Sequence, residues 1–130
     1  MCIFCDIIDG NIPSKKVYED DKFLAILDIS QTTMGHTLVM PKKHYENMLE
    51  MPENEYGELM MLVHRLASKI VGNLSANGVN ILINTNASAG QTVMHTHVHI
   101  IPRYDENDTI KISFAENKYD LDEVLNKINN

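Results

Sequence analysis

Three of the six histidines lie within five positions, as His95, His97 and His99. Alternate side chains of a β-strand share a face, so an extended segment puts these imidazoles on one side, roughly 6.7 Å apart. Neutral imidazole is a nucleophile near pH 7, and it also binds metals and transfers protons. A solvated strand face is the simpler interpretation, but valine, threonine and tyrosine fill such positions more readily than histidine. The spacing therefore favours a site with separate roles for the three side chains.

The only two cysteines, Cys2 and Cys5, have the spacing of zinc ligands. Structural zinc is commonly held by two cysteines and two histidines, so the fold would have to supply two histidines from elsewhere. His44 and His95 are the available candidates. A redox pair and two inert buried thiols remain alternative interpretations of the same motif.

The composition limits the class of protein. A chain of 130 residues with 44% hydrophobic and 22% charged residues is typical of one soluble globular domain. The net charge of −7 disfavours nonspecific binding to nucleic acid or to an anionic membrane. No apolar run approaches the 18 or so residues that cross a bilayer, and no export signal follows Met1. These features predict a cytoplasmic protein with no nucleic-acid or membrane partner, in which cysteines stay reduced.

The hydrophobic pattern predicts a sheet. Short apolar runs bounded by polar or glycine-containing segments predict strands at 23–27, 36–40, 79–83 and about 93–101. The run at 79–83 is typical of a buried strand, and Pro102 is expected to close the last one.

Helical periodicity is clear in one long segment. Apolar residues recur every three or four positions from Tyr56 to Leu74, behind Pro52, and the pair Asn77–Gly78 is suited to the positive φ of a helix end. A second, short helix is expected between Leu121 and Ile128, whereas 104–115 has no clear periodicity. Together the elements predict an α+β fold with the long helix packed on one face of the sheet.

The segment from Gly90 to Ile101 closely resembles the signature of the histidine-triad (HIT) family. The stretches 2–13 and 28–44 are similar to the zinc-containing bacterial nucleotide-binding branch, which is purine nucleoside phosphoramidase-like. The likeness covers roughly residues 1–104. It implies one HIT domain over 1–130, with a core of about 1–104 and a C-terminal segment at 105–130. It also implies an antiparallel sheet that extends across a homodimer.

The resemblance implies a nucleotide hydrolase or transferase. Its substrate would be a purine, AMP-type phosphoramidate or related conjugate, attacked at the α-phosphate to give a covalent nucleotidyl intermediate on His97. The implied catalytic residues are His97, His99, His36 and Thr92. The implied nucleotide-binding residues are Ile7, Asp28, Ile29, Asn84, Gly90, Gln91, Thr92, His97 and His99. The implied cofactor is a structural zinc on Cys2, Cys5, His44 and His95, with no organic cofactor.

Individual roles follow from matching positions. Asp28 would bind the ribose hydroxyls, Ile7 and Ile29 would line the base pocket, and Asn84 would contact the phosphate or the leaving group. Ordinary roles in turns and loops are the alternatives for these accessory residues. Two positions depart from the family pattern: Gln31 stands where proline is common, and Thr96 where a bulkier aliphatic residue is usual.

Several functions stay open at this stage. A dinucleoside polyphosphate hydrolase would use the same covalent chemistry, a metallohydrolase would use a catalytic zinc to activate water, and a regulatory module would only bind nucleotides. Asp28 is the only carboxylate in a motif, and the cysteine site already requires His95. Both observations favour the covalent mechanism. The segment after Tyr104 matches nothing in the family pattern, so the leaving group stays undetermined.

Overall fold

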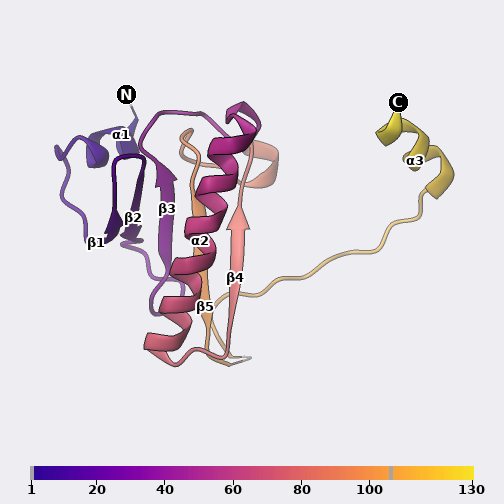
Figure 1. Cartoon of the computed structure of the whole chain (residues 1–130). Coiled ribbons are helices and arrows are strands. Elements are labelled where there is room, and N and C mark those ends of the chain that lie inside the picture. Colours follow the sequence, from indigo (N-terminus) through magenta and orange to yellow (C-terminus); the bar gives the residue numbers. More distant parts are fainter. Residues whose placement is uncertain (1, 106) are drawn as a thin grey trace.

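The computed structural model describes residues 2–105 and 107–130. Five strands form one antiparallel sheet in the order β1-β2-β3-β5-β4 (Figure 1). The strands are β1 Lys16–Glu19, β2 Phe23–Leu27, β3 Thr37–Pro41, β4 Gly78–Ile83 and β5 Val98–Arg103. The helices are α1 Ile3–Ile8, α2 Glu53–Leu74 and α3 Leu121–Asn129, with short 3₁₀ turns at Met48–Glu50 and Ala87–Ala89. The α+β prediction with an antiparallel sheet is confirmed.

The long helix α2 covers one face of the sheet (Figure 1). Its buried residues recur at intervals of three and four and pack onto inward-facing sheet residues such as Ala25 and Val98. The helix ends earlier than the predicted Asn77, because Ser75 already adopts the left-handed conformation with φ of 56°. The N–H groups of Ser75 and Ala76 then bond to carbonyls of the last helical turn.

A second, smaller core lies on the opposite face of the sheet. It contains Phe4 of α1 and alternate residues of β2 and β3, such as Leu38 and Met40, whereas Val39 faces α2. Neither α1 nor β1 was predicted from the sequence. Because His99 of β5 is paired with Leu38, its side chain belongs to the α1 side of the sheet.

The strand that carries the histidines is shorter at its start than predicted. β5 begins at Val98 rather than Val93, because the preceding segment bonds to a loop instead of a strand: both the N–H and the hydroxyl of Thr96 donate to the carbonyl of Tyr45. These two bonds give Thr96 a structural role at a position where the family pattern usually has an aliphatic residue. His95 and His97 lie outside the strand, and His99 lies within it.

Pro102 does not close β5, contrary to the sequence prediction. It lies inside the strand, opposite Val79 of β4. The neighbouring strand β3 pairs with β5 only as far as Ile100, so the missing N–H of Pro102 interrupts no β3 bond. The carbonyl of Pro102 accepts a hydrogen bond from the hydroxyl of Thr33, at 2.6 Å.

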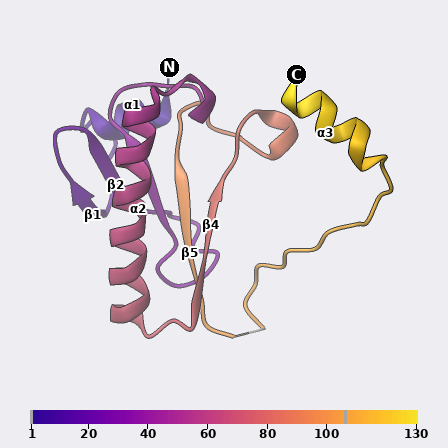
Figure 2. The same cartoon turned by 45° about the vertical axis from the view of Figure 1, so that its right-hand side comes forward.

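The strand β4 forms an edge of the sheet and is not buried as predicted. Ile81 and Leu82 are 42% and 40% exposed. The predicted terminal helix is present as α3, capped by the Asp120 carboxylate, and it stands apart from the sheet and α2 (Figure 2). Its apolar side chains, including Leu125, are exposed.

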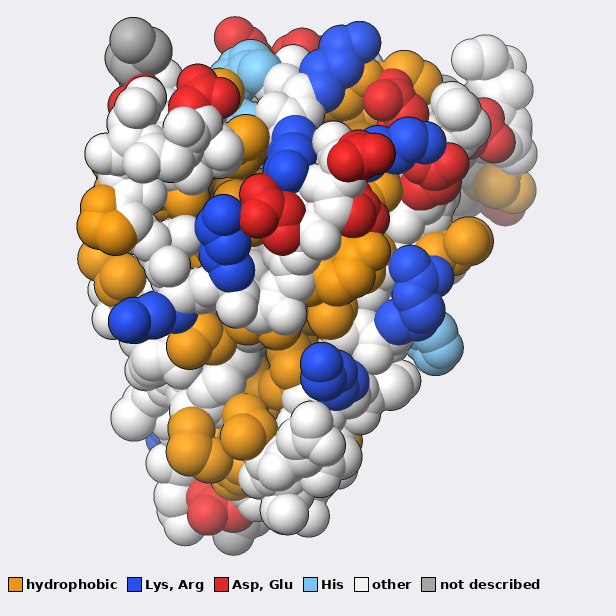
Figure 3. Space-filling view, turned by 60° about the vertical axis from the view of Figure 1, so that its left-hand side comes forward, with side chains coloured by type: hydrophobic (Ala, Val, Ile, Leu, Met, Phe, Trp, Pro, Cys, Tyr) orange, Lys and Arg blue, Asp and Glu red, His pale blue; other side chains and the backbone are white. Residues whose placement is uncertain are grey.

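Acidic side chains lie among the lysines and arginines in the upper part of the face drawn in Figure 3. Glu19, for example, pairs with both Lys16 and Lys42, at 2.8 and 2.9 Å. Of the helices in the described ranges, none has the length and apolarity needed to cross a bilayer.

Candidate active site

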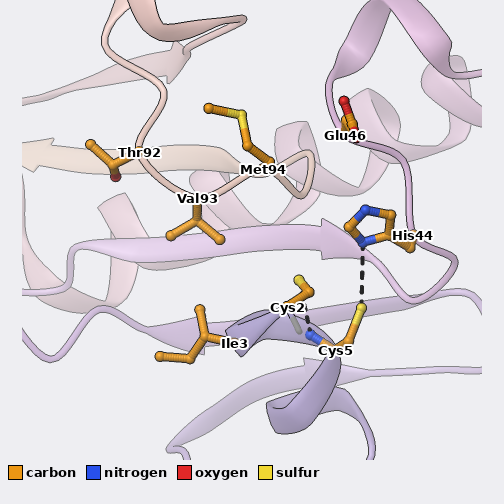
Figure 4. Close-up of a pocket in the computed structure, with 8 residues that line it drawn as sticks. All are labelled: Cys2, Ile3, Cys5, His44, Glu46, Thr92, Val93 and Met94. Carbon is orange, nitrogen blue, oxygen red and sulfur yellow. Dashed lines mark hydrogen bonds between the residues drawn. The ribbon is translucent and has the colours of Figure 1, made fainter.

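The four predicted metal ligands converge on one point. Cys2 and Cys5 lie at the start of α1, His44 follows β3, and His95 precedes β5; their four ligand atoms lie within 4.8 Å of one another. We call these four residues the metal cluster. Cys5 Sγ lies 3.4 Å from His44 Nδ1 (Figure 4), and Cys2 Sγ lies 3.5 Å from His95 Nδ1. Ligands of tetrahedral zinc lie about 3.5 Å apart when one is sulfur and one is nitrogen. The residues therefore fit a tetrahedral zinc ion.

The orientation of His95 also suits a metal ligand. Its ring is fully buried, and Nε2 lies 2.7 Å from the carbonyl oxygen of Pro41. Nε2–H therefore donates to that carbonyl, which leaves the Nδ1 lone pair directed at the other ligands. Burial lowers the pKa of His95, so the ring stays neutral, as a metal ligand must be. Burial and the Cys2 thiol raise the pKa of Cys5 to about 11, so a cation is needed to stabilise its thiolate.

His97 lies directly before β5, with 7% of its surface exposed. Its Nδ1 lies 2.7 Å from the carbonyl oxygen of His95, so Nδ1–H donates there and the Nε2 lone pair is free. The ring of Phe4 packs edge-on against the imidazole, with centroids 4.9 Å apart. Burial lowers the pKa of His97. The result is a neutral imidazole, held in one orientation, with one nitrogen available as a nucleophile.

A chain of hydrogen bonds sets the tautomers of His36 and His99. The N–H of Thr32 donates to His36 Nδ1 at 3.4 Å, and His36 Nε2 lies 2.9 Å from His99 Nδ1. His36 therefore carries its proton on Nε2 and donates to His99, whose own proton is then on Nε2. Burial, together with His97 and His36, lowers the pKa of His99 to about 4. His99 thus presents a neutral N–H donor, with its ring centroid 5.1 Å from that of His97.

The loop between β2 and β3 brings Asp28 to His36. Gln31 bridges the loop, because its amide donates to the carbonyls of Asp28 and His36, at 2.6 and 2.8 Å, and its Oε1 accepts from Gly35. A glutamine thus stabilises the loop where the family pattern usually has proline. The carboxylate of Asp28 lies 3.7 Å from His36 Nε2.

Asp28 and Ile29 line a cavity of about 600 Å³ with Pro13 and Leu27. Ile29 is fully exposed in this cavity, which leaves its side chain free to contact a ligand. Ile7, the other predicted base contact, is half-buried and packs against the smaller core instead of lining the cavity. Only one of the two predicted base contacts is therefore in this cavity.

The side chain of Gln91 is used within the protein. It is 4% exposed, its amide donates to the carbonyls of Glu46 and Val93, and its Oε1 accepts from Asn86 N–H. Its backbone N–H donates to the Asn86 carbonyl. Gln91 therefore supports the loop, and no polar atom of its side chain is free for a nucleotide.

The remaining predicted contacts in this loop differ from one another. The N–H of Gly90 is bonded to Ala87, whereas the N–H of Thr92 has no hydrogen-bond acceptor among residues 2–105 and 107–130. Thr92 is exposed and lines a cavity of about 660 Å³ beside the metal cluster (Figure 4). Within the described chain it makes no hydrogen bond to His97. Asn84 is half-buried just after β4.

Two residues near the histidines were missed by sequence reasoning. Phe4 packs against both His95 and His97, and the carbonyl of Pro41 orients His95. The position of Phe4 between the two cysteines was a signal, because a helix there buries one side chain under the metal cluster. The Pro41 contact involves only a backbone atom, so no residue type could have indicated it.

Comparisons with known proteins agree with this geometry. The HIT domain model matches residues 9–106. An uncharacterised HIT-like protein of Methanocaldococcus jannaschii is 50% identical over 129 residues, covering 98% of both chains. The adenylylsulfatase HINT3 of Arabidopsis thaliana is 39% identical over 120 residues, covering 92% of this chain and 60% of that protein.

Two solved structures are similar as well. A HIT family member from Bacillus subtilis has a TM-score of 0.91 and 43% identity, covering 98% of this chain and 92% of that chain. A Zn-bound histidine triad family protein from Mycobacterium smegmatis has a TM-score of 0.79 and 39% identity, covering 84% and 79%. On the strength of the matched domain and these relatives, the chain belongs to the HIT family.

Proposed function

We propose that the protein is a nucleotide hydrolase or transferase that acts at the α-phosphate of purine nucleoside phosphoramidates or related conjugates. The observation that carries this proposal is the environment of His97, whose Nδ1–H is bonded to the His95 carbonyl and whose Nε2 is free. A neutral, oriented imidazole is suited to attack on phosphorus. The relative described as an adenylylsulfatase supports chemistry on an adenylyl group.

In the first step, the Nε2 lone pair of His97 forms a bond to the α-phosphorus, and the bond from phosphorus to the leaving group breaks. The leaving group departs with its electron pair and takes a proton from solvent or from a neighbouring donor. The new nucleotidyl-imidazolium carries positive charge. The carbonyl of His95, 2.7 Å from Nδ1, accepts the hydrogen bond that stabilises this charge.

In the second step, water attacks phosphorus, the bond to His97 breaks, and AMP is released with the neutral imidazole restored. Phosphoryl oxygens gain charge in both steps, and fixed donors stabilise that charge. The Nε2–H of His99 is one such donor, because His36 holds its proton on that nitrogen. The free N–H of Thr92 is a second candidate donor.

The nucleoside would occupy the cavity lined by Asp28 and Ile29. A carboxylate accepts two hydrogen bonds, which matches the two ribose hydroxyls, and Ile29 offers an apolar surface to the base. The metal cluster would hold a structural zinc that fixes His95, and through its carbonyl, His97. The Zn-bound relative from Mycobacterium smegmatis supports such an ion.

We also propose that two copies pair through β4. This edge strand exposes Ile81 and Leu82, and a cavity of about 400 Å³ between α2 and β4 is lined by apolar residues such as Met60 and Val63. An exposed apolar edge strand is a natural pairing surface. Light scattering should give twice the monomer mass, and Leu82→Lys should return the protein to a monomer.

A metallohydrolase is disfavoured by the tautomers of the site. His95 directs its metal-binding nitrogen at the cysteines, so the triad cannot supply three histidine ligands to one catalytic ion. A dinucleoside polyphosphate remains an alternative substrate of the same chemistry, and a pure binding module remains the nonenzymatic alternative.

Hydrolysis of adenosine phosphoramidate tests the proposal. The zinc-loaded wild type should turn over, and His97→Ala should lose activity at least about 10³-fold, as expected for loss of a nucleophile. Lys69→Gln, on the exposed face of α2, is the control and should keep wild-type rates. AMP binding without turnover in the wild type would indicate a binding module instead.

A further inference from the structure

A second group of metal-binding atoms lies outside the metal cluster. It consists of a carboxylate oxygen of Asp28, Nε2 of His36 and Nδ1 of His99, all within 4.8 Å of one another. His36 Nε2 lies 2.9 Å from His99 Nδ1 and 3.7 Å from Asp28 Oδ2. We propose that these three residues form a second cation site, which takes a divalent transition-metal ion in competition with the nucleotide.

The distances suit three ligands on one side of an ion. Ligands about 2.1 Å from a metal lie about 3.0 Å apart when they meet at a right angle, and about 3.6 Å apart at 120°. The separations of 2.9 and 3.7 Å from His36 Nε2 match these two angles. Two imidazoles and one carboxylate, with the remaining positions left to water, are a common donor set for divalent transition metals.

Metal binding requires the other tautomer of His36, in which Nε2 releases its proton to solvent and Nδ1 takes one up. In the metal-free state His36 carries its proton on Nε2 and donates to His99. In the metal-bound state Nδ1 of His36 carries the proton, and the two facing lone pairs go to the ion. The cost is the bond from Thr32 N–H to His36 Nδ1, which at 3.4 Å is long. His99 keeps its proton on Nε2.

Charge and access also favour an ion. The Asp28 carboxylate is 21% exposed and lines the open cavity, so an ion can reach it from solvent. Among the described residues, no lysine or arginine pairs with the Asp28 carboxylate, and the imidazole of His36 lies beside it at 3.7 Å. A nearby cation stabilises the negative charge of a partly buried carboxylate. Imidazole ligands select Zn²⁺ or Co²⁺ over Mg²⁺, which prefers six oxygen ligands.

The competition with nucleotide rests on the proposed function. In the proposed function, Asp28 binds the ribose hydroxyls. A carboxylate that coordinates an ion has fewer lone pairs left to accept hydrogen bonds from these hydroxyls. Free transition-metal ions would therefore inhibit the enzyme by occupying the ribose subsite, whereas the ion of the metal cluster would be needed for folding.

The experiment is a titration of zinc-loaded protein with Co²⁺, followed by visible absorption and calorimetry. A second equivalent should bind with the absorption of a cobalt–imidazole site and without a thiolate-to-cobalt band, since the cysteines keep their zinc. Asp28→Asn should weaken this binding at least about tenfold. Asp21→Asn, in the exposed turn between β1 and β2, is the matched control and should leave it unchanged.

AMP is added last, to wild type holding the second equivalent of Co²⁺. Displacement of the ion supports competition at Asp28, whereas AMP binding with the ion retained overturns it. Absence of a second equivalent, or a second equivalent unaffected by Asp28→Asn, overturns the site itself. Hydrolysis without added metal is measured in parallel, so that failure of the proposed function is seen separately.

Discussion

His95 and His97 are two residues apart, yet they belong to different sites. In the metal cluster, Nδ1 of His95 lies 3.1 Å from Nδ1 of His44, a separation that suits two ligands of one cation. Around His97, in contrast, each imidazole has one defined tautomer: His97 donates from Nδ1 to a carbonyl, and His36 donates from Nε2 to His99. The metal cluster has the ligand arrangement of an ion site, whereas hydrogen bonds order the other site.

The difference arises in the backbone. Because β5 begins only at Val98, the segment before it is free to turn His95 toward the cysteines. The carbonyl of His95 stays with His97, so His95 contributes its ring to the metal cluster and its carbonyl to the orientation of His97. The metal cluster should therefore control stability, whereas His97 and His99 should control chemistry.

The largest expected effect is loss of the metal. Cys5→Ser, or strong chelation of the wild type, should lower the free energy of unfolding by more than about 3 kcal/mol, because the folded state alone assembles the ligands. Thermal unfolding of matched samples measures this, with Lys69→Gln as the control within about 0.5 kcal/mol. An unchanged melting temperature after verified metal removal would contradict a structural role.

The converse effect is expected at His99. His99→Ala removes the N–H donor that faces the phosphate, and hydrolysis should fall about 10²–10³-fold. The melting temperature should fall less than in Cys5→Ser, since no ligand of the metal cluster is lost. The two variants together test whether stability and chemistry separate. Equal losses of stability in both would show that they do not.

Substitution of Gln91 also tests whether stability and nucleotide binding depend on different residues. Its buried amide makes three hydrogen bonds to the backbone, so Gln91→Ala should destabilise the protein by about 2 kcal/mol. Nucleotide affinity, measured by calorimetry on folded protein, should change less than about threefold. A large loss of affinity with unchanged stability would instead make Gln91 a direct nucleotide contact.

The smallest effect concerns pH. Burial lowers the pKa of His97 from its ordinary 6.5, so the imidazole stays neutral as the pH falls through 6.5 and is protonated only below it. Single-turnover hydrolysis should therefore keep its rate through pH 6.5 and decline at lower pH. An acid midpoint at or above 6.5 would mean that His97 is not buried in the active state.

Much of this arrangement could be predicted from the sequence. The strand at 23–27 was predicted with its observed bounds, because five apolar residues lie between polar turns. The start of β5 was not predicted correctly, because the bonds of Thr96 to Tyr45 are tertiary contacts that no local sequence pattern contains. The six-residue helix α1 was missed because it is stabilised by Phe4 and the metal cluster rather than by its own periodicity.

The most direct test of the account is the mass of the intact protein after brief mixing with adenosine phosphoramidate. Wild type and His99→Ala should carry an adenylyl adduct, which should accumulate further in His99→Ala because its hydrolysis is slowed. His97→Ala should carry none. Turnover that proceeds without an adduct and survives His97→Ala would contradict covalent catalysis by His97.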